Sequence, residues 1–197
     1  MRSFSFVFVG MMAMAVGFGN CRCRGQETAI AAPAARPTLE AIGRHDASRT
    51  VECAKASIRV VDGDTLKCSR TKIRVLGVDT PETRKTGRYA EPGQEPYGSN
   101  AKALTERLVA EARTVLIFFA ASGDDKGRDL AHVLFVGANG TEKLLGLELL
   151  NKGLAYETCG HYGNNGFAEF CRQIKAADDA APKRGFLEPW KYKKRKH

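Results

Sequence analysis

The sequence Val60-Val61-Asp62-Gly63-Asp64-Thr65, followed by Arg74-Val75-Leu76-Gly77-Val78-Asp79-Thr80-Pro81-Glu82-Thr83, organises the rest of the chain. It places four carboxylates and one arginine within 21 residues, at the ends of two apolar runs. Carboxylates brought this close repel one another unless a cation lies between them, and they are the hard oxygen ligands that Ca²⁺ or Mg²⁺ takes. An arginine beside them indicates a second anion, for which phosphate is the usual candidate. The stretch therefore predicts a metal-assisted site that cleaves phosphodiesters.

The apolar pattern on both sides of this stretch predicts short strands and a few helices. Strands are expected where β-branched or alternating apolar residues end at a turn, at 58–61, 65–68, 73–78, 115–119 and 130–136. Helical spacing or a short apolar run before a glycine predicts helices at 101–112, 144–150 and 167–181. Five short strands with a helix between the third and fourth predict a mainly β, α+β fold. The expected architecture is a five-stranded Greek-key β-barrel of the OB type with about three helices.

The ends of the chain differ from the middle in composition. Residues 1–19 begin with Arg2 and continue as an almost unbroken apolar run, which is typical of a signal peptide and short for a membrane span. Residues 20–55 are rich in Ala, Pro, Arg and Gly and predict a flexible linker. We expect the folded domain at 56–190 and a basic tail at 191–197. The domain is then secreted, periplasmic or attached to the cell envelope, with membrane contact only if the first segment is an uncleaved anchor.

The net charge of +9 and the pI of about 9.4 favour a polyanionic partner, either nucleic acid or an anionic membrane surface. Part of this charge is concentrated in the tail, which contains Lys191, Lys193, Lys194, Arg195 and Lys196 and no acid. Two interpretations of the tail are open: a solvated end, or the active part of an envelope-tethered interaction domain. Nothing in the sequence implies a stable protein partner, and we expect a monomer.

The chain contains six cysteines, none of them in a CxxC pair, so a zinc site is not expected. In an exported protein they are candidates for disulfides. Cys159 and Cys171 flank a loop that they would close, and Cys53 and Cys68 would pair across the first hairpin. Free buried cysteines are the alternative, and the sequence leaves both open.

Three motifs in this order resemble the staphylococcal (thermo)nuclease family, with the resemblance covering about residues 56–190. They are Asp62-Gly63-Asp64-Thr65, then Arg74-x-x-x-Val78-Asp79-Thr80-Pro81-Glu82, then Gly127-Arg128-x-Leu130-Ala131. The resemblance implies a nuclease of the OB type that depends on one Ca²⁺ ion, with other divalent metals as alternatives. It also implies that DNA and RNA are the substrates and that the products end in 3′-phosphates.

The resemblance also assigns roles to individual residues. It implies that the metal is held by the Asp64 and Asp79 carboxylates and the Thr80 carbonyl, with Asp62 behind them orienting water. Glu82 matches the proposed general base.

Two arginines, Arg74 and Arg128, match the phosphate clamp of the family. Two guanidinium groups can donate to the non-bridging oxygens, which gain charge as phosphorus becomes five-coordinate.

The sequence departs from the family pattern in the turn before Arg128. This turn reads Asp124-Asp125-Lys126-Gly127, where the type member has a lysine–tyrosine pair that contacts the nucleotide. Lys126 is a candidate substitute for that pair, and Tyr162 lies in the loop where the family places nucleotide-contacting tyrosines. We interpret Asp124 and Asp125 as solvated turn residues. A non-catalytic nucleic-acid-binding module of the same fold is the alternative function, although relatives of that kind usually lack one or more of the acids or arginines present here.

Overall fold

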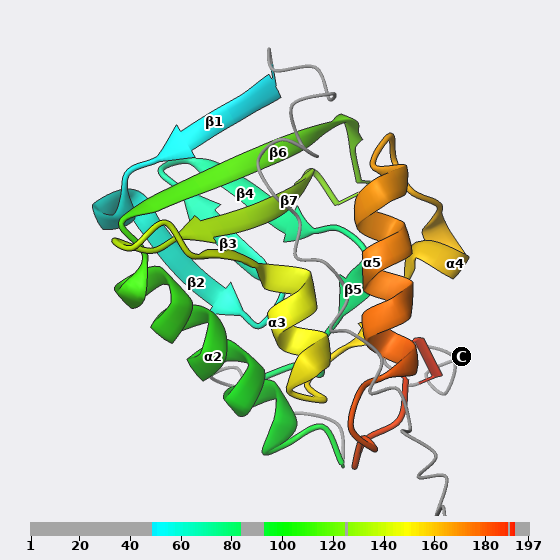
Figure 1. Ribbon diagram of the computed structural model, residues 1–197. Coiled ribbons are helices and arrows are strands. Elements are labelled where there is room, and N and C mark those ends of the chain that lie inside the picture. The colour runs from blue at the N-terminus through cyan, green and yellow to red at the C-terminus, as the bar shows by residue number, and fades with distance from the viewer. Residues whose placement is uncertain (1–48, 84–92, 125, 189, 192–197) are drawn as a thin grey trace, which may run out of the picture. The chain divides into compact units, whose positions relative to one another are not determined.

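The computed structural model describes residues 49–83, 93–124, 126–188 and 190–191 (Figure 1). The expected signal segment at 1–19 and the tail beyond Lys191 lie outside these residues. The strands are β1 (Thr50–Cys53), β2 (Ile58–Asp62), β3 (Thr65–Cys68), β4 (Thr71–Val75), β5 (Val78–Asp79), β6 (Thr114–Gly123), β7 (Asp129–Val136), β8 (Glu142–Leu144) and β9 (Tyr156–Glu157). The helices are the 3₁₀ turn η2 (Lys55–Ser57) and the α-helices α2 (Tyr97–Glu111), α3 (Leu145–Asn151), α4 (Cys159–Tyr162) and α5 (Ala168–Asp179).

Seven of the strands form one sheet in the order β1-β6-β7-β4-β3-β2, with β8 added alongside β7. All neighbours are antiparallel except β4 and β7, which run parallel from Ile73↔Asp129 to Val75↔Ala131. The parallel pairing brings the end of β4 beside the start of β7, two segments more than 50 residues apart in the chain. The two edge strands, β1 and β2, follow each other in sequence through η2.

The prediction of an α+β fold of the OB type is confirmed, but the strand count of five is wrong. The predicted third strand, 73–78, is interrupted at Gly77, whose φ of +80° turns the chain between β4 and β5. The short strand β5 then pairs with β9 outside the main sheet. The sheet is also open rather than a closed barrel, because β1 and β2 do not pair in the described part of the chain. The three predicted helices are α2, α3 and α5, and α4 is an additional single turn.

The prediction of a linker over residues 20–55 is wrong at its C-terminal end. Thr50–Cys53 is strand β1, which pairs with β6 from Thr50↔Phe118 to Cys53↔Val115. Only one of its four residues, Cys53, is buried, so the segment lacks the repeated apolar positions that mark a strand in sequence. Its pairing partner is more than 60 residues away, and the ladder with β6 makes it a strand.

The helices cover the sheet and complete the core. In Figure 1, α2 runs along β2, and α3 lies between β7 and α5. Leu104 and Leu108 of α2 pack with Leu66 and Ile73 of the sheet, and all four side chains are buried. Within the described residues, no helix has the length and apolar character needed to cross a membrane.

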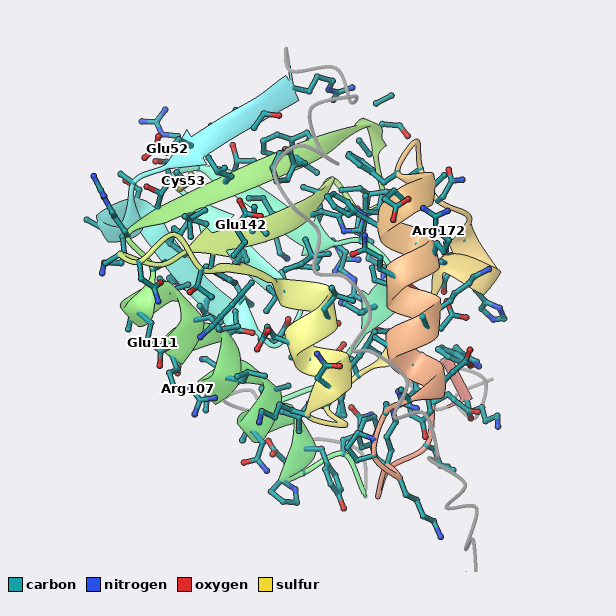
Figure 2. All side chains as sticks on the ribbon, in the orientation of Figure 1. Glu52, Cys53, Arg107, Glu111, Glu142 and Arg172 are labelled. Carbon is teal, nitrogen blue, oxygen red and sulfur yellow. A yellow bond between two sulfur atoms is a disulfide. The ribbon has the colours of Figure 1, made fainter. Side chains whose placement is uncertain are left out.

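The described residues contain two disulfides, Cys53–Cys68 and Cys159–Cys171. The first joins β1 to β3, and the second joins α4 to α5 around a loop. Both pairs are those considered from the sequence, so the alternative of free cysteines is excluded for these four residues. Cys53 is at the end of β1 in Figure 2, beside the connection to η2.

Candidate functional site

The Asp62-Gly63-Asp64 turn between β2 and β3 is held against α2. A Cβ atom on Gly63 would lie 2.6 Å from the Cβ of Ala101, so only glycine allows the helix to approach this closely. The Thr105 hydroxyl, fully buried in α2, donates a hydrogen bond of 2.8 Å to the Gly63 carbonyl. The helix therefore determines where the two aspartates of the turn lie.

Asp64 is tied to the segment after β5. Its Oδ2 atom accepts hydrogen bonds from the Thr80 backbone N–H at 2.7 Å and from the Thr80 hydroxyl at 3.0 Å. Asp64, Asp79 and Thr80 are all buried. Carboxylates from the two motifs, 15 residues apart in sequence, are thus brought to one place.

Arg74 lies between these two carboxylates. Its guanidinium forms ion pairs with Asp64 and with Asp79, and it donates a hydrogen bond of 3.3 Å to the Val78 carbonyl. Two buried carboxylates next to each other need a positive charge nearby, and here the arginine supplies it. The same residue is one of the two predicted phosphate-clamping arginines.

The donor set is chemically suited to a hard divalent cation. Asp62 is only 8% exposed, and its Oδ1 atom has no hydrogen-bond partner among the described residues. A buried carboxylate oxygen without a donor is suited to a cation or to water that a cation orders. Asp64, Asp79 and the Thr80 carbonyl would provide the other oxygens. Arg74 is paired with both Asp64 and Asp79. In the described part of the chain, no three His, Cys, Asp or Glu side chains are close enough together to hold a metal ion.

Arg128, at the start of β7, is held by Asp124. The carboxylate accepts hydrogen bonds from the Arg128 backbone N–H at 2.9 Å and from its Nε at 2.7 Å, and Nη2 lies 2.6 Å away. The interpretation of Asp124 as a solvated turn residue is therefore wrong, because its side chain is only 14% exposed and is bonded to the arginine. Burial alone would raise the pKa of Asp124, but the hydrogen bonds and charge of Arg128 outweigh burial and hold the pKa below its ordinary value.

Glu82 is exposed, and its backbone contacts residues 12 and 16 positions further along the chain. Its N–H donates a hydrogen bond to the side-chain oxygen of Gln94, which is only 3% exposed. A Cβ atom on Gly98, in the first turn of α2, would lie 2.3 Å from the Glu82 carbonyl oxygen. Neither Gln94 nor Gly98 was identified from the sequence, because nothing in the local pattern links them to Glu82.

A polar cavity of about 210 Å³ brings the predicted residues together. It is lined by side chains from both halves of the sequence pattern and by Lys72, which the sequence did not single out. The residues are Val61, Asp62, Asp64, Thr65, Lys72, Arg74, Asp79, Glu82, Lys126 and Arg128. Thr80 is not part of this lining but contacts it through Asp64.

A second cavity of about 370 Å³ adjoins the first and shares Arg74, Asp79, Lys126 and Arg128 with it. Tyr162, 63% exposed on α4, lies in its wall. The two residues proposed to contact substrate, Lys126 and Tyr162, are therefore at the edge of the site. Their role in binding remains a prediction.

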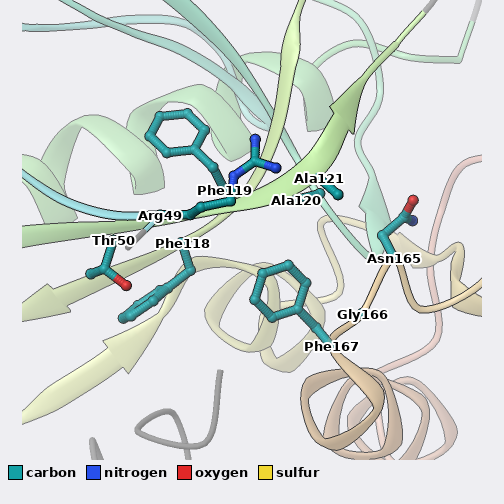
Figure 3. A pocket seen from close by; sticks show the side chains of 9 residues that line it. All are labelled: Arg49, Thr50, Phe118, Phe119, Ala120, Ala121, Asn165, Gly166 and Phe167. Carbon is teal, nitrogen blue, oxygen red and sulfur yellow. The ribbon is translucent and has the colours of Figure 1, made fainter. Parts of the chain in front are cut away.

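A third cavity, of about 190 Å³, differs in character (Figure 3). It lies where β1 starts and is walled mainly by aromatic and small side chains, among them Phe118 and Phe167. No carboxylate lines it, so the chemistry predicted from the sequence belongs to the polar cavity.

Comparison with known proteins agrees with the motifs. The family model of staphylococcal nuclease homologues matches residues 72–186, which is more than half of the chain. No curated protein matches the chain. The match begins within β4 and includes Arg74, Asp79, Glu82 and Arg128. The chain therefore belongs to the family of staphylococcal nuclease homologues.

Proposed function

We propose that this protein is an exported, Ca²⁺-dependent phosphodiesterase that hydrolyses DNA and RNA and leaves 3′-phosphate products. The observation that carries the proposal is the shared cavity, in which Glu82, Arg74 and Arg128 lie around buried carboxylates. Family membership supports a nuclease. The two disulfides support export, because such bonds persist in oxidising compartments.

The carboxylates of Asp64 and Asp79, with the Thr80 carbonyl, would hold the divalent cation. When bound, the cation supplies Lewis-acid polarisation of a phosphoryl oxygen and neutralises part of its charge. Asp62 lines the same cavity, its Oδ1 has no hydrogen-bond partner among the described residues, and it would orient water there.

Side chains of the protein carry out the other steps of the proposed reaction. The Arg74 and Arg128 guanidinium groups donate to the non-bridging oxygens, whose negative charge increases in the transition state. Glu82 accepts a proton from the water molecule whose oxygen forms the new bond to phosphorus. The bond from phosphorus to the 5′-oxygen breaks, and that oxygen takes a proton from solvent water and leaves as a hydroxyl. The 3′-oxygen keeps the phosphate.

The test is a cleavage assay on purified protein with single-stranded DNA and with RNA, in Ca²⁺ and in excess chelator. We expect acid-soluble nucleotides only with Ca²⁺, and a loss of rate on the order of 10²–10³ for Arg128→Ala. Glu82→Gln is expected to abolish most of the remaining activity. End-group analysis of the products distinguishes 3′-phosphates from 5′-phosphates.

Two outcomes would contradict the proposal. Wild-type rates in both variants would show that the assignment of the site is wrong. Binding of DNA without cleavage in any divalent metal would instead identify a non-catalytic nucleic-acid-binding module.

A further inference from the structure

Three basic residues form a row across neighbouring strands β2, β3 and β4. Arg59 is directly opposite Lys67 in the β2–β3 pairing, and Lys67 is directly opposite Lys72 in the β3–β4 pairing. Directly paired residues point to the same face of a sheet, with Cβ atoms about 5 Å apart. Arg59 and Lys72 are exposed and Lys67 is half-buried. The three cations therefore extend about 10 Å across the outer face of the sheet.

This row is on the same face as the candidate site. Lys72 and Arg74 are two residues apart in β4, so their side chains point to the same side, while Ile73 between them is fully buried in the core. Thr65 and Lys67 have the same relationship in β3.

A β-bulge keeps β2 in phase with its neighbours. Asp62 pairs with Thr65 and Arg59 with Lys67, although three positions separate Asp62 from Arg59 where alternation would require two. The extra residue, Val61, lies in the irregularity between Val60 and Asp62. Because of the bulge, the row Asp62–Thr65–Arg74 and the basic row are on one face, about 7 Å apart along the strands.

The basic row has no internal counter-charge. Among the described residues, no carboxylate forms an ion pair with Arg59, Lys67 or Lys72. Like charges placed directly opposite each other in a sheet destabilise it. Some other basic residues in the described part of the chain do have a carboxylate partner, such as Lys102 with Glu106 and Lys143 with Glu111. An external anion is therefore the group that would satisfy this row.

We infer that Arg59, Lys67 and Lys72 form a binding track for the phosphate backbone of one nucleic-acid strand, leading to the cleavage site. Lys72 connects the two, because it belongs to the row and also lines the polar cavity with Arg74 and Glu82. A phosphate at the site would lie at the row Asp62–Thr65–Arg74. The next phosphates of the same nucleic-acid strand would lie at the basic row. We therefore expect the protein to prefer a nucleic-acid polymer to a mononucleotide as its substrate. This inference rests on the proposed function.

The test is equilibrium binding of a fluorescent oligothymidylate of about 15 nucleotides, followed by anisotropy over a range of salt concentrations. The full chain carries Glu82→Gln in every sample, so that the oligonucleotide is not consumed during the measurement. The test variant adds Arg59→Gln, Lys67→Gln and Lys72→Gln. The matched control adds Arg113→Gln, Lys152→Gln and Lys175→Gln, which remove the same charge from exposed positions before β6, after α3 and on α5.

We expect the slope of log K against log salt to fall by about 2 in the test variant, because three phosphate contacts on a single strand are lost. Affinity at low salt should fall by on the order of tenfold to a hundredfold. The control should keep the parent slope. Thermal unfolding should show the test variant to be at least as stable as the parent, because the repulsion between strands is relieved.

The inference is overturned if the test variant has the same slope and affinity as the control, or if the parent does not bind the oligonucleotide. A parallel cleavage assay on the wild-type chain keeps the proposals separate. Binding through the track without cleavage would remove the proposed enzymatic function and leave the track standing.

Discussion

The Asp124 carboxylate holds Arg128 by its backbone and its guanidinium at the same time, at 2.9 Å from the backbone nitrogen and 2.7 Å from Nε. The bond closes the turn between β6 and β7 and fixes the direction of the arginine. The arginine side chain is 19% exposed and reaches the polar cavity from this turn. The turn is thus part of the site rather than a connection between strands.

Asp124→Asn should lower kcat more than it raises KM, because the arginine would still be present but would no longer be held in one orientation. A displacement of about 1 Å in a catalytic group can cost on the order of 10²-fold in rate, and we expect a loss of at least tenfold. Steady-state cleavage of DNA measures both parameters. The matched control is Asp129→Asn, an exposed carboxylate five residues on. Equal effects of the two substitutions would show that Asp124 does not position Arg128.

The same substitution should change how stability depends on pH. The folded-state pKa of Asp124 lies below its ordinary value of 3.8, so the ionised carboxylate contributes stability that is fully present above this value. That contribution is lost as the pH falls through the folded-state pKa. Urea unfolding of wild type and Asp124→Asn should therefore differ most near neutral pH and converge in acid. A difference that grows as the pH falls would contradict the assignment.

Arg74→Met should destabilise the protein in chelator by about 3 kcal/mol, because Asp64 and Asp79 would be left as buried carboxylates without a counter-charge. Saturating Ca²⁺ should reduce this difference, since a cation bound by the two carboxylates would supply the missing positive charge. Urea unfolding with and without Ca²⁺ measures the effect independently of activity.

The control for Arg74 is Arg107→Met on α2. Arg107 and Glu111 form an exposed pair at 3.8 Å and are labelled on that helix in Figure 2. Its loss should cost less than about 1 kcal/mol, with or without Ca²⁺. If Ca²⁺ stabilised wild type and Arg74→Met by the same amount, the cation and the arginine would not share one site.

Gln94→Ala should lower kcat by about tenfold while leaving the Glu82 carboxylate in the protein. The substitution removes the acceptor for the Glu82 N–H, and the segment that carries the proposed general base would lose its attachment to Gln94, just before α2. Gln173→Ala, which removes a hydrogen bond of 2.9 Å to Glu169 on α5, is the control. Unchanged turnover in Gln94→Ala would show that Glu82 is positioned by other contacts.

Replacing Cys53 and Cys68 together by serine should lower the free energy of unfolding by about 3 kcal/mol. The disulfide closes a loop of 15 residues, and the chain-entropy estimate for that length is about 3 kcal/mol. Urea unfolding checks this value. Because the bond joins β1 to β3 and does not line the polar cavity, the rate of cleavage by the folded variant should be close to that of wild type. If the variant were fully folded but inactive, β1 would be shown to influence the site.

The sequence by itself determined the order of the main elements and predicted the chemistry of the site. Asp62, Asp64, Asp79 and Glu82 are at the ends of short apolar runs, and this local pattern is visible without any knowledge of distant contacts. The three predicted helices are present, and so are the predicted strands, although the third is divided at Gly77 into β4 and β5. Alternation and helical spacing show these segments because they record which side of each faces the core. The motifs also identified the family.

Only the tertiary structure decided which residues support the chemistry. Gln94 accepts a hydrogen bond from Glu82, 12 residues before it, and Asp124 holds Arg128. Strand β1 exists because β6 pairs with it. The Val61 bulge places the basic row on the same face as the opening Asp-Gly-Asp motif. Three of these depend on a partner 12 or more residues away or on the register between strands, which the pattern of a single segment does not encode. The contact between Asp124 and Arg128 is local, but the sequence of a turn does not show which of its side chains bond to each other.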